Sequence, residues 1–264
     1  MRGHARLTVE RVGERSVLSA VYCASPLHVQ GSLATPERHA ELAVLNVAGG
    51  VVGGDSLTTD VTVAPAAPAR LITVGATRLY RCDDRPSAST LNARVGWGAL
   101  LEYLPDETIP YAGADHVGSI EVDLESSGAA ILGEVIAPGR LHHGERFAYR
   151  RLLLRTAIRE DGAPLLRDVL LLQPDRLAPT APTVLGAYTH LATLYACGRG
   201  ADPTLADALY RLLADARIHG GATTGAHNLV IMRALGHDAH TLLGIIRRAA
   251  ALCRVHLRPA KASG

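Results

Sequence analysis

The chain has 264 residues, of which 48% are hydrophobic and 20% are charged, and its formal net charge at pH 7 is +2. A chain of this length can bury a large core, and this composition excludes an intrinsically disordered protein. The near-neutral charge and the scattered arginines argue against a dedicated nucleic-acid-binding protein, which would present a basic face.

The sequence predicts neither a secretory leader nor a membrane-spanning helix. The stretch MRGHARLTVERVG has no continuous apolar run, and no segment approaches the roughly 20 apolar residues that cross a bilayer. The four cysteines contain no Cys-x-x-Cys pair, which favours free thiols in a reducing compartment. We therefore expect a soluble, cytoplasmic protein that contacts neither membranes nor nucleic acids.

The first two thirds of the chain have the pattern of short β-strands. Apolar and polar residues alternate in SIEVDLES (119–126), SLTTDVTVAP (56–65) and RRLLLRTAIRE (150–160). Asp161-Gly162 lies between two such runs and predicts a hairpin turn. Because no helical pattern separates the strands, we expect a mainly β fold of stacked sheets, mostly antiparallel or coiled, and not a doubly wound sheet.

The last third of the chain changes to a helical pattern. Residues 203–217 and 237–258 carry apolar residues at helical spacing, and Asp238 is a candidate N-cap of the second helix. The apolar stripes consist of Leu205, Leu209, Leu212 and Leu213, then Leu242, Ile245, Ile246, Ala249 and Leu252. We therefore predict a β-rich body over 1–175 and a C-terminal part over 176–264 whose helices pack on it.

The segment NVAGGVVGGDSL (46–57) contains four glycines followed by an acid: Gly49, Gly50, Gly53, Gly54 and Asp55. A Walker loop needs Lys-Ser/Thr after its glycines, and a dinucleotide-binding loop needs Gly-x-Gly-x-x-Gly at the start of a helix. Neither pattern is present, so we interpret the glycines as structural. They allow sharp turns with positive φ or a close approach of two backbones. This interpretation does not explain Asp55.

Several acids stand in apolar sequence: Asp55, Glu102, Glu134 and Asp168. A carboxylate in such a run must be paired, bound to a cation or exposed to water, because burying it alone is costly. The outer face of a half-buried strand explains any one of them. The presence of four such acids favours the alternative, in which they line an internal polar path.

The 12 histidines form no metal-binding pattern. His142 and His143 are adjacent on the chain, and His237 and His240 are two imidazoles without a third ligand. No Gly-x-Ser-x-Gly or His-Glu-x-x-His motif appears. We predict no catalytic residues and no tight metal site.

Six motifs follow one another along the chain: GGVVGGD (49–55), GATRLYR (75–81), LEYLPDETI (101–109), GEVIAPGRLHHGERF (133–147), LLRDVLLL (165–172) and VIMRALG (230–236). Together they resemble the motif series of the urease accessory protein family UreD, called UreH in some lineages. The chain has Asn46-Val47-Ala48 where the family usually has His-Pro-Pro.

The resemblance implies a non-enzymatic scaffold with an irregular, β-helix-like body and a small helical part. It implies binding to a UreF-type accessory protein, through it to a UreG-type GTPase, and docking on the urease apoenzyme. It also implies transient passage of Ni²⁺ through an internal channel, with no tightly bound cofactor. The matching channel-lining candidates are Asp55, Thr77, Glu134 and Asp168.

Two alternatives remain open from the residues. Paired carboxylates, such as Glu102 with Glu107 or Asp55 with Glu134, could serve a hydrolase. The chain could also be a β-rich binding module of another complex.

Overall fold

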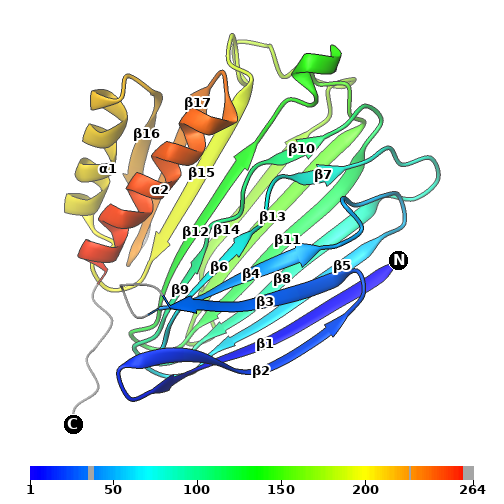
Figure 1. Cartoon of the computed structure of the whole chain (residues 1–264). Coiled ribbons are helices and arrows are strands. Elements are labelled where there is room, and N and C mark those ends of the chain that lie inside the picture. Colours follow the sequence, from blue (N-terminus) through cyan, green and yellow to red (C-terminus); the bar gives the residue numbers. More distant parts are fainter. Residues whose placement is uncertain (35–38, 226, 258–264) are drawn as a thin grey trace.

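The computed structural model describes residues 1–34, 39–225 and 227–257. It has three layers, in which two β-sheets stack on each other and two helices cover part of the second sheet (Figure 1). The mainly β fold of stacked sheets with a small C-terminal helical part is therefore confirmed.

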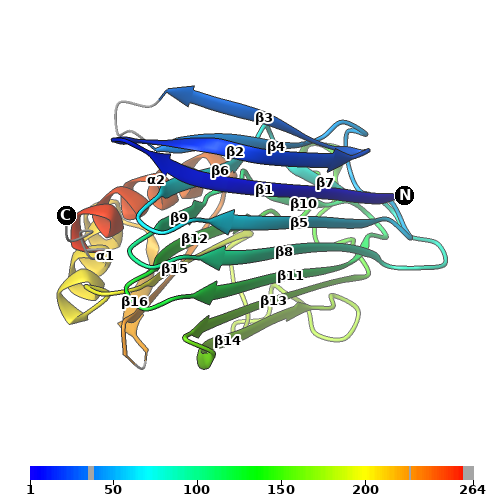
Figure 2. The same ribbon diagram turned by 90° about the horizontal axis from the view of Figure 1, so that it is seen from below.

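We name the first sheet sheet A. In spatial order it contains β14 (Ala163–Leu172), β13 (Arg151–Glu160), β11 (Asp115–Leu124), β8 (Ser87–Val95), β5 (Ser56–Val63), β1 (Arg2–Val12) and β2 (Arg15–Ala24). Figure 2 shows these strands side by side, with β14 and β2 at the two edges.

The second sheet is sheet B. It contains β16 (His219–Thr224), β17 (Leu229–Gly236), β15 (His190–Cys197), β12 (Ala129–Ile136), β9 (Leu100–Tyr103), β6 (Pro68–Thr73), β4 (Ala40–Asn46) and β3 (Leu27–Ala34). Two short strands, β7 (Thr77–Leu79) and β10 (Thr108–Pro110), join it beside β12. A 3₁₀ turn spans Leu141–His143.

The chain alternates between the two sheets, so that it coils as in a β-solenoid. Strands β5, β8, β11 and β13 of sheet A pair in parallel, and so do β4, β6, β9 and β12 of sheet B. Of the two expected arrangements, antiparallel or coiled, the coiled one is therefore present at the centre of both sheets, where the pairing is parallel and not antiparallel. Antiparallel pairs occur toward the edges, such as β1–β2 and β13–β14. A parallel pair needs a crossover, and here a strand of the other sheet takes the place usually filled by a helix.

The predicted strand faces and hairpin are confirmed. On β11, Ile120, Val122 and Leu124 are buried, whereas Glu121 and Asp123 are exposed. The β13–β14 hairpin turns at Asp161-Gly162, where both residues have positive φ, +49° and +79°. Those values are the ones that a two-residue turn between twisted strands requires.

Both predicted helices are present. Helix α1 spans Pro203–Asp215 and α2 spans Ala239–His256; Arg258, the last residue of the predicted second helix, lies outside the described residues. Asp238 caps α2 by accepting a hydrogen bond from the Thr241 N–H at 2.7 Å. The C-terminal part also supplies β15, β17 and β16, which extend sheet B, so both predicted parts share one sheet.

Two apolar cores hold the layers together. The larger lies between the sheets and contains Leu7, Leu71, Leu101 and Leu132 among its fully buried side chains. The smaller joins the other face of sheet B to the apolar stripes of α1 and α2. On sheet B, strands β12, β15, β16 and β17 therefore contact the helices.

Candidate functional site: a polar passage between the sheets

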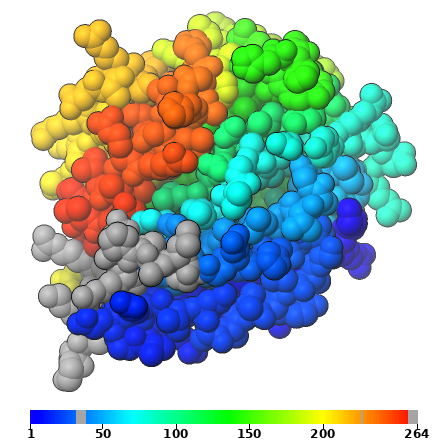
Figure 3. Space-filling view, viewed as in Figure 1, coloured from blue at the N-terminus to red at the C-terminus, as the bar shows by residue number. Residues whose placement is uncertain are grey.

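A cavity of about 320 Å³ lies between the two sheets. Exposed Val47 and Val74 line its outer end, so it reaches the surface, which is hollowed where the light-blue, cyan and green segments meet (Figure 3). Thr77 on β7 lies in the lining near this end, and its N–H donates to the Glu107 carbonyl at 2.9 Å. The wall also contains polar side chains in the interior: Ser89, Tyr103, His116 and Glu134.

Glu134 faces the space between the sheets. It lies on β12 on the same face as Leu132 and Ile136, which belong to the inter-sheet core. Burial, and to a lesser extent the negative charge of Asp168, raises the pKa of Glu134 from 4.5 to about 7. Glu134 can therefore gain or lose a proton near neutral pH.

A second, much smaller space of about 10 Å³ continues beyond Glu134, enough for about one water molecule. The strand registers put its polar lining at one level, with Glu134 opposite Thr193 and Thr193 opposite Arg233 on sheet B. On sheet A, Thr156 is opposite Asp168 at the same space. Glu134 and Leu154 line both spaces, so Glu134 stands at their junction.

Asp168 connects the two sheets at the outer end of this narrow space. It accepts a hydrogen bond from the Tyr195 hydroxyl at 2.5 Å and forms an ion pair with Arg233. Burial would raise the pKa of Asp168, but these two partners hold it below its usual value. Arg233 is half exposed and Asp168 is 21% exposed, so this pair separates the narrow space from solvent.

Asp55 lies in the glycine turn, and it is not in the lining of either cavity. Its side chain is buried, accepts a hydrogen bond from the Val52 N–H at 3.1 Å and contacts the amino group of Met1. These two contacts satisfy the buried carboxylate of Asp55 and so give it a structural role in the turn. Its role in a passage stays a prediction.

The glycines allow the turn to pack closely against its neighbours. Gly49 and Gly54 both have φ of +79°. A Cβ on Gly50 would stand 2.2 Å from the Tyr80 ring, and one on Gly53 would stand 3.0 Å from the Arg85 carbonyl oxygen. Both kinds of constraint favour glycine.

The turn supports a chain of ring contacts that the sequence alone did not reveal. The Tyr80 ring meets Tyr111 edge-on at 5.0 Å between centroids, and the Arg140 guanidinium lies 4.3 Å from the centre of the Tyr111 ring. Glu145 holds Arg140 through two contacts, one of them at 2.9 Å. This series of contacts links the motifs GGVVGGD, GATRLYR and GERF in space.

We expect Gly50→Ala to lower the free energy of unfolding by about 1 to 2 kcal/mol, because the Tyr80 ring must move. Urea denaturation of the purified chain measures this change. Gly244→Ala is the matched control, since Gly244 lies in α2 with open space around its Cβ position, and alanine favours a helix. Equal stability of both variants would contradict the proposed packing.

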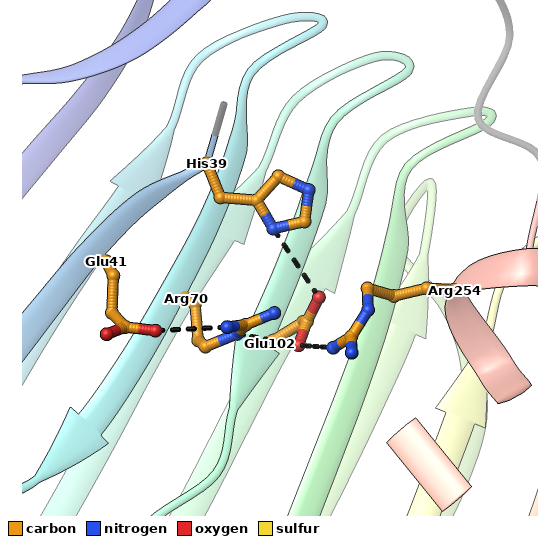
Figure 4. Close-up of polar contacts among 5 residues, drawn as sticks. All are labelled: His39, Glu41, Arg70, Glu102 and Arg254. Carbon is orange, nitrogen blue, oxygen red and sulfur yellow. Dashed lines mark hydrogen bonds and ion pairs between the residues drawn. The ribbon is translucent and has the colours of Figure 1, made fainter. Parts of the chain in front are cut away.

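Glu102 is fully buried on the opposite face of sheet B, in a charged cluster (Figure 4). It accepts hydrogen bonds from Arg70 Nε at 3.1 Å and from Arg254 Nη1 of α2 at 2.7 Å. Arg70 also donates to Glu41 at 3.0 Å, and His39 lies 3.8 Å from Glu102. The cluster attaches the end of α2 to β4, β6 and β9.

These positions give no support to a carboxylate-dependent hydrolase. Glu102 faces the helix side with two arginines, Asp55 belongs to the glycine turn, and Glu134 faces the inter-sheet space. An acid–base mechanism needs two free carboxyl groups around one substrate site. Neither proposed pair shares a cavity lining among the described residues.

Among the described residues, no group of three or more His, Cys, Asp or Glu side chains could hold a metal ion. His116, which lines the larger cavity, interacts through its two ring nitrogens with Ser87 at 2.8 Å and Ser89 at 2.9 Å. Burial lowers its pKa to about 4, so it is neutral at physiological pH. The cavity wall therefore presents separate polar side chains, and both ring nitrogens of His116 already have partners.

A family model described as UreD urease accessory protein matches residues 1–263. The chain belongs to the UreD family. Urease accessory protein UreD of Herpetosiphon aurantiacus is 36% identical over 92% of this chain and 88% of its own length. UreD of Haloarcula marismortui is 32% identical over 98% of this chain and 88% of its own length. UreD of Cenarchaeum symbiosum is 28% identical over 98% of this chain and 93% of its own length.

Membership in the UreD family gives the chain a role in urease maturation, and the relatives are accessory proteins by name. No helix in the described ranges is long and apolar enough to cross a membrane.

Proposed function

We propose that this UreD-family chain is a non-catalytic scaffold that passes Ni²⁺ between the sheets toward urease. The observation that carries the proposal is the position of Glu134, at the junction of a large surface-connected cavity and a narrow polar space that ends at Asp168. Ni²⁺ is the cargo in this proposal, and the chain keeps no resident metal.

The chemistry of the wall suits a cation that must leave again. Carboxylates, hydroxyls and water bind Ni²⁺ loosely, whereas a thiolate and imidazole cage would retain it. Because the pKa of Glu134 is about 7, the cation can displace its proton on arrival and the proton can return on departure. The charge of Glu134 therefore needs no permanent partner in the empty passage.

The proposed partners are a UreF-type accessory protein, a UreG-type GTPase bound through it, and the urease apoprotein. A scaffold of this kind needs surfaces for two proteins and a path between them. The large uncovered face of sheet A and the separate helical layer on sheet B supply two distinct surfaces.

We expect Glu134→Leu to reduce the nickel content and activity of co-expressed urease at least tenfold while the partner proteins still co-purify. Leucine removes the only group of the junction that titrates near pH 7 among the described residues. Metal analysis of purified urease measures the loading directly. Asp84→Leu, at an exposed loop position outside both proposed surfaces, is the matched control.

Full nickel loading with Glu134→Leu would overturn the passage proposal. Loss of the partner proteins together with nickel would instead assign Glu134 a structural role. Asp168→Asn provides a second probe of the same path, because asparagine keeps the shape of the side chain but weakens the ion pair with Arg233.

A further inference from the structure

The outer face of sheet A has an apolar row at its β14 edge. The registers place Val117 of β11 opposite Leu153 of β13, and Leu153 opposite Leu171 of β14. These residues point away from the inter-sheet core, because their neighbours Leu152, Leu172 and Leu154 face inward. Leu171 is 51% exposed, and neither helix contacts sheet A closely.

The arginines beside this row differ from one another in their partners. Arg151 pairs with Asp115 at 2.8 Å, and Arg159 lies 3.5 Å from Asp123. The same ladder places Ser119 and Val169 beside Arg155. Arg155 is exposed and, among the described residues, makes no ion pair.

Arg167 on β14 is also exposed and also lacks an ion pair within the described part of the chain. Its neighbour on β13 is Ala157, and Val169, which is 54% exposed, follows two residues later on the same face. The result is an exposed apolar strip with two unneutralised guanidinium groups. Arginine beside apolar side chains is characteristic of protein interfaces, since its planar guanidinium can donate two parallel hydrogen bonds to one carboxylate.

The strip also runs along a free edge. Strand β14 has ten residues and pairs only with β13 in sheet A. Its other side presents unpaired backbone groups, which soluble proteins usually protect or use for pairing with a partner. Figure 2 shows β14 as the last strand of the sheet.

We propose that this region, the β14 face, is a docking surface for a partner protein that presents carboxylates around an apolar centre. The β14 face consists of Val117, Leu153, Arg155, Arg167, Val169 and Leu171. Three strands about 4.8 Å apart and about 26 Å long give the β14 face roughly 370 Å², about half of the 800 Å² that each partner contributes to a typical interface, so a partner docked here would also cover neighbouring strands of sheet A.

Other occupants fit the β14 face less well. A second copy of this chain would bring the same two arginines to the contact, which opposes association. Nucleic acid would satisfy the arginines but would leave the apolar side chains of Leu171 and Val169 without apolar contacts. An acidic protein surface can satisfy the free arginines and cover the apolar row.

The test rests on the proposed function, since its probes are the purified urease apoprotein and the UreF-type protein. We expect the double variant Arg155→Glu/Arg167→Glu to weaken binding of one of these proteins at least tenfold by biolayer interferometry and to leave the other unchanged. Binding of the wild type to that partner should weaken as salt rises, because exposed charges are screened. Arg211→Glu, on the exposed side of α1, is the matched control.

Unchanged binding of both proteins by the folded double variant would overturn the inference. A wild-type dimer in light scattering that this variant abolishes would also overturn it and identify the occupant as a second copy. If the wild type binds neither protein, the proposed function itself fails, which is a different result. Should the double variant unfold on a thermal melt, Arg155→Gln/Val169→Ser tests the same face with neutral side chains, and the same tenfold loss is expected.

Discussion

Glu102→Ala is expected to lower the free energy of unfolding by about 3 to 5 kcal/mol, because removal of one member of a buried ion pair leaves its partners uncompensated. Glu102 is fully buried, and the side chains of Arg70 and Arg254 are only 14% and 24% exposed. Without the carboxylate, Arg70 keeps Glu41, whereas the contact between Arg254 and the sheet is lost. The end of α2 should therefore detach first.

Chemical denaturation followed by circular dichroism measures this loss, and hydrogen exchange of α2 locates it. The matched control is Glu121→Ala, which also removes a carboxylate near an arginine but at a site that is 51% exposed, where Arg159 is 3.6 Å away. An exposed pair contributes about 0 to 1 kcal/mol. If Glu102→Ala costs no more than this control, the cluster does not hold α2 to sheet B.

The second large effect is a pH dependence caused by Glu134. Because its pKa rises from 4.5 to about 7 on folding, the folded chain binds more protons than the unfolded chain between these pH values. The stabilisation is fully present below pH 4.5 and is lost as pH rises to about 7. We expect Glu134 to contribute a decrease on the order of 2 to 3 kcal/mol in the free energy of unfolding across this window.

The difference between the wild type and Glu134→Gln isolates this contribution. The pKa of His190 and the pKa of His116 are both lowered by burial, so these histidines change stability in the opposite direction over part of the same window. Both histidines are present in both proteins, and their effect cancels in the difference. A difference that stays constant from pH 4.5 to 7.5 would show that Glu134 does not have a raised pKa.

Local sequence patterns predicted the buried face of β11 and the buried stripes of α1 and α2. A period of two marks one face of a strand, as in β11, and a period near 3.6 marks one stripe of a helix, as in α2. Caps and tight turns depend on neighbouring residues only, so Asp238 and Asp161-Gly162 could be assigned without the fold. The same reasoning identified Glu134 and Asp168 as acids that need an explanation.

Only the tertiary structure decided where each acid lies. Alternation along a strand separates two faces but does not say which layer each face meets, so Glu102 and Glu134 looked alike in the sequence. In the fold, Glu102 meets Arg254, 152 residues away along the chain, on the helix side, and Glu134 meets the space between the sheets. The direction of pairing was also hidden, because a strand pattern is the same in parallel and antiparallel sheets. The path past Glu134 to Asp168 and Arg233 depends on contacts between strands distant in sequence, which no local pattern encodes.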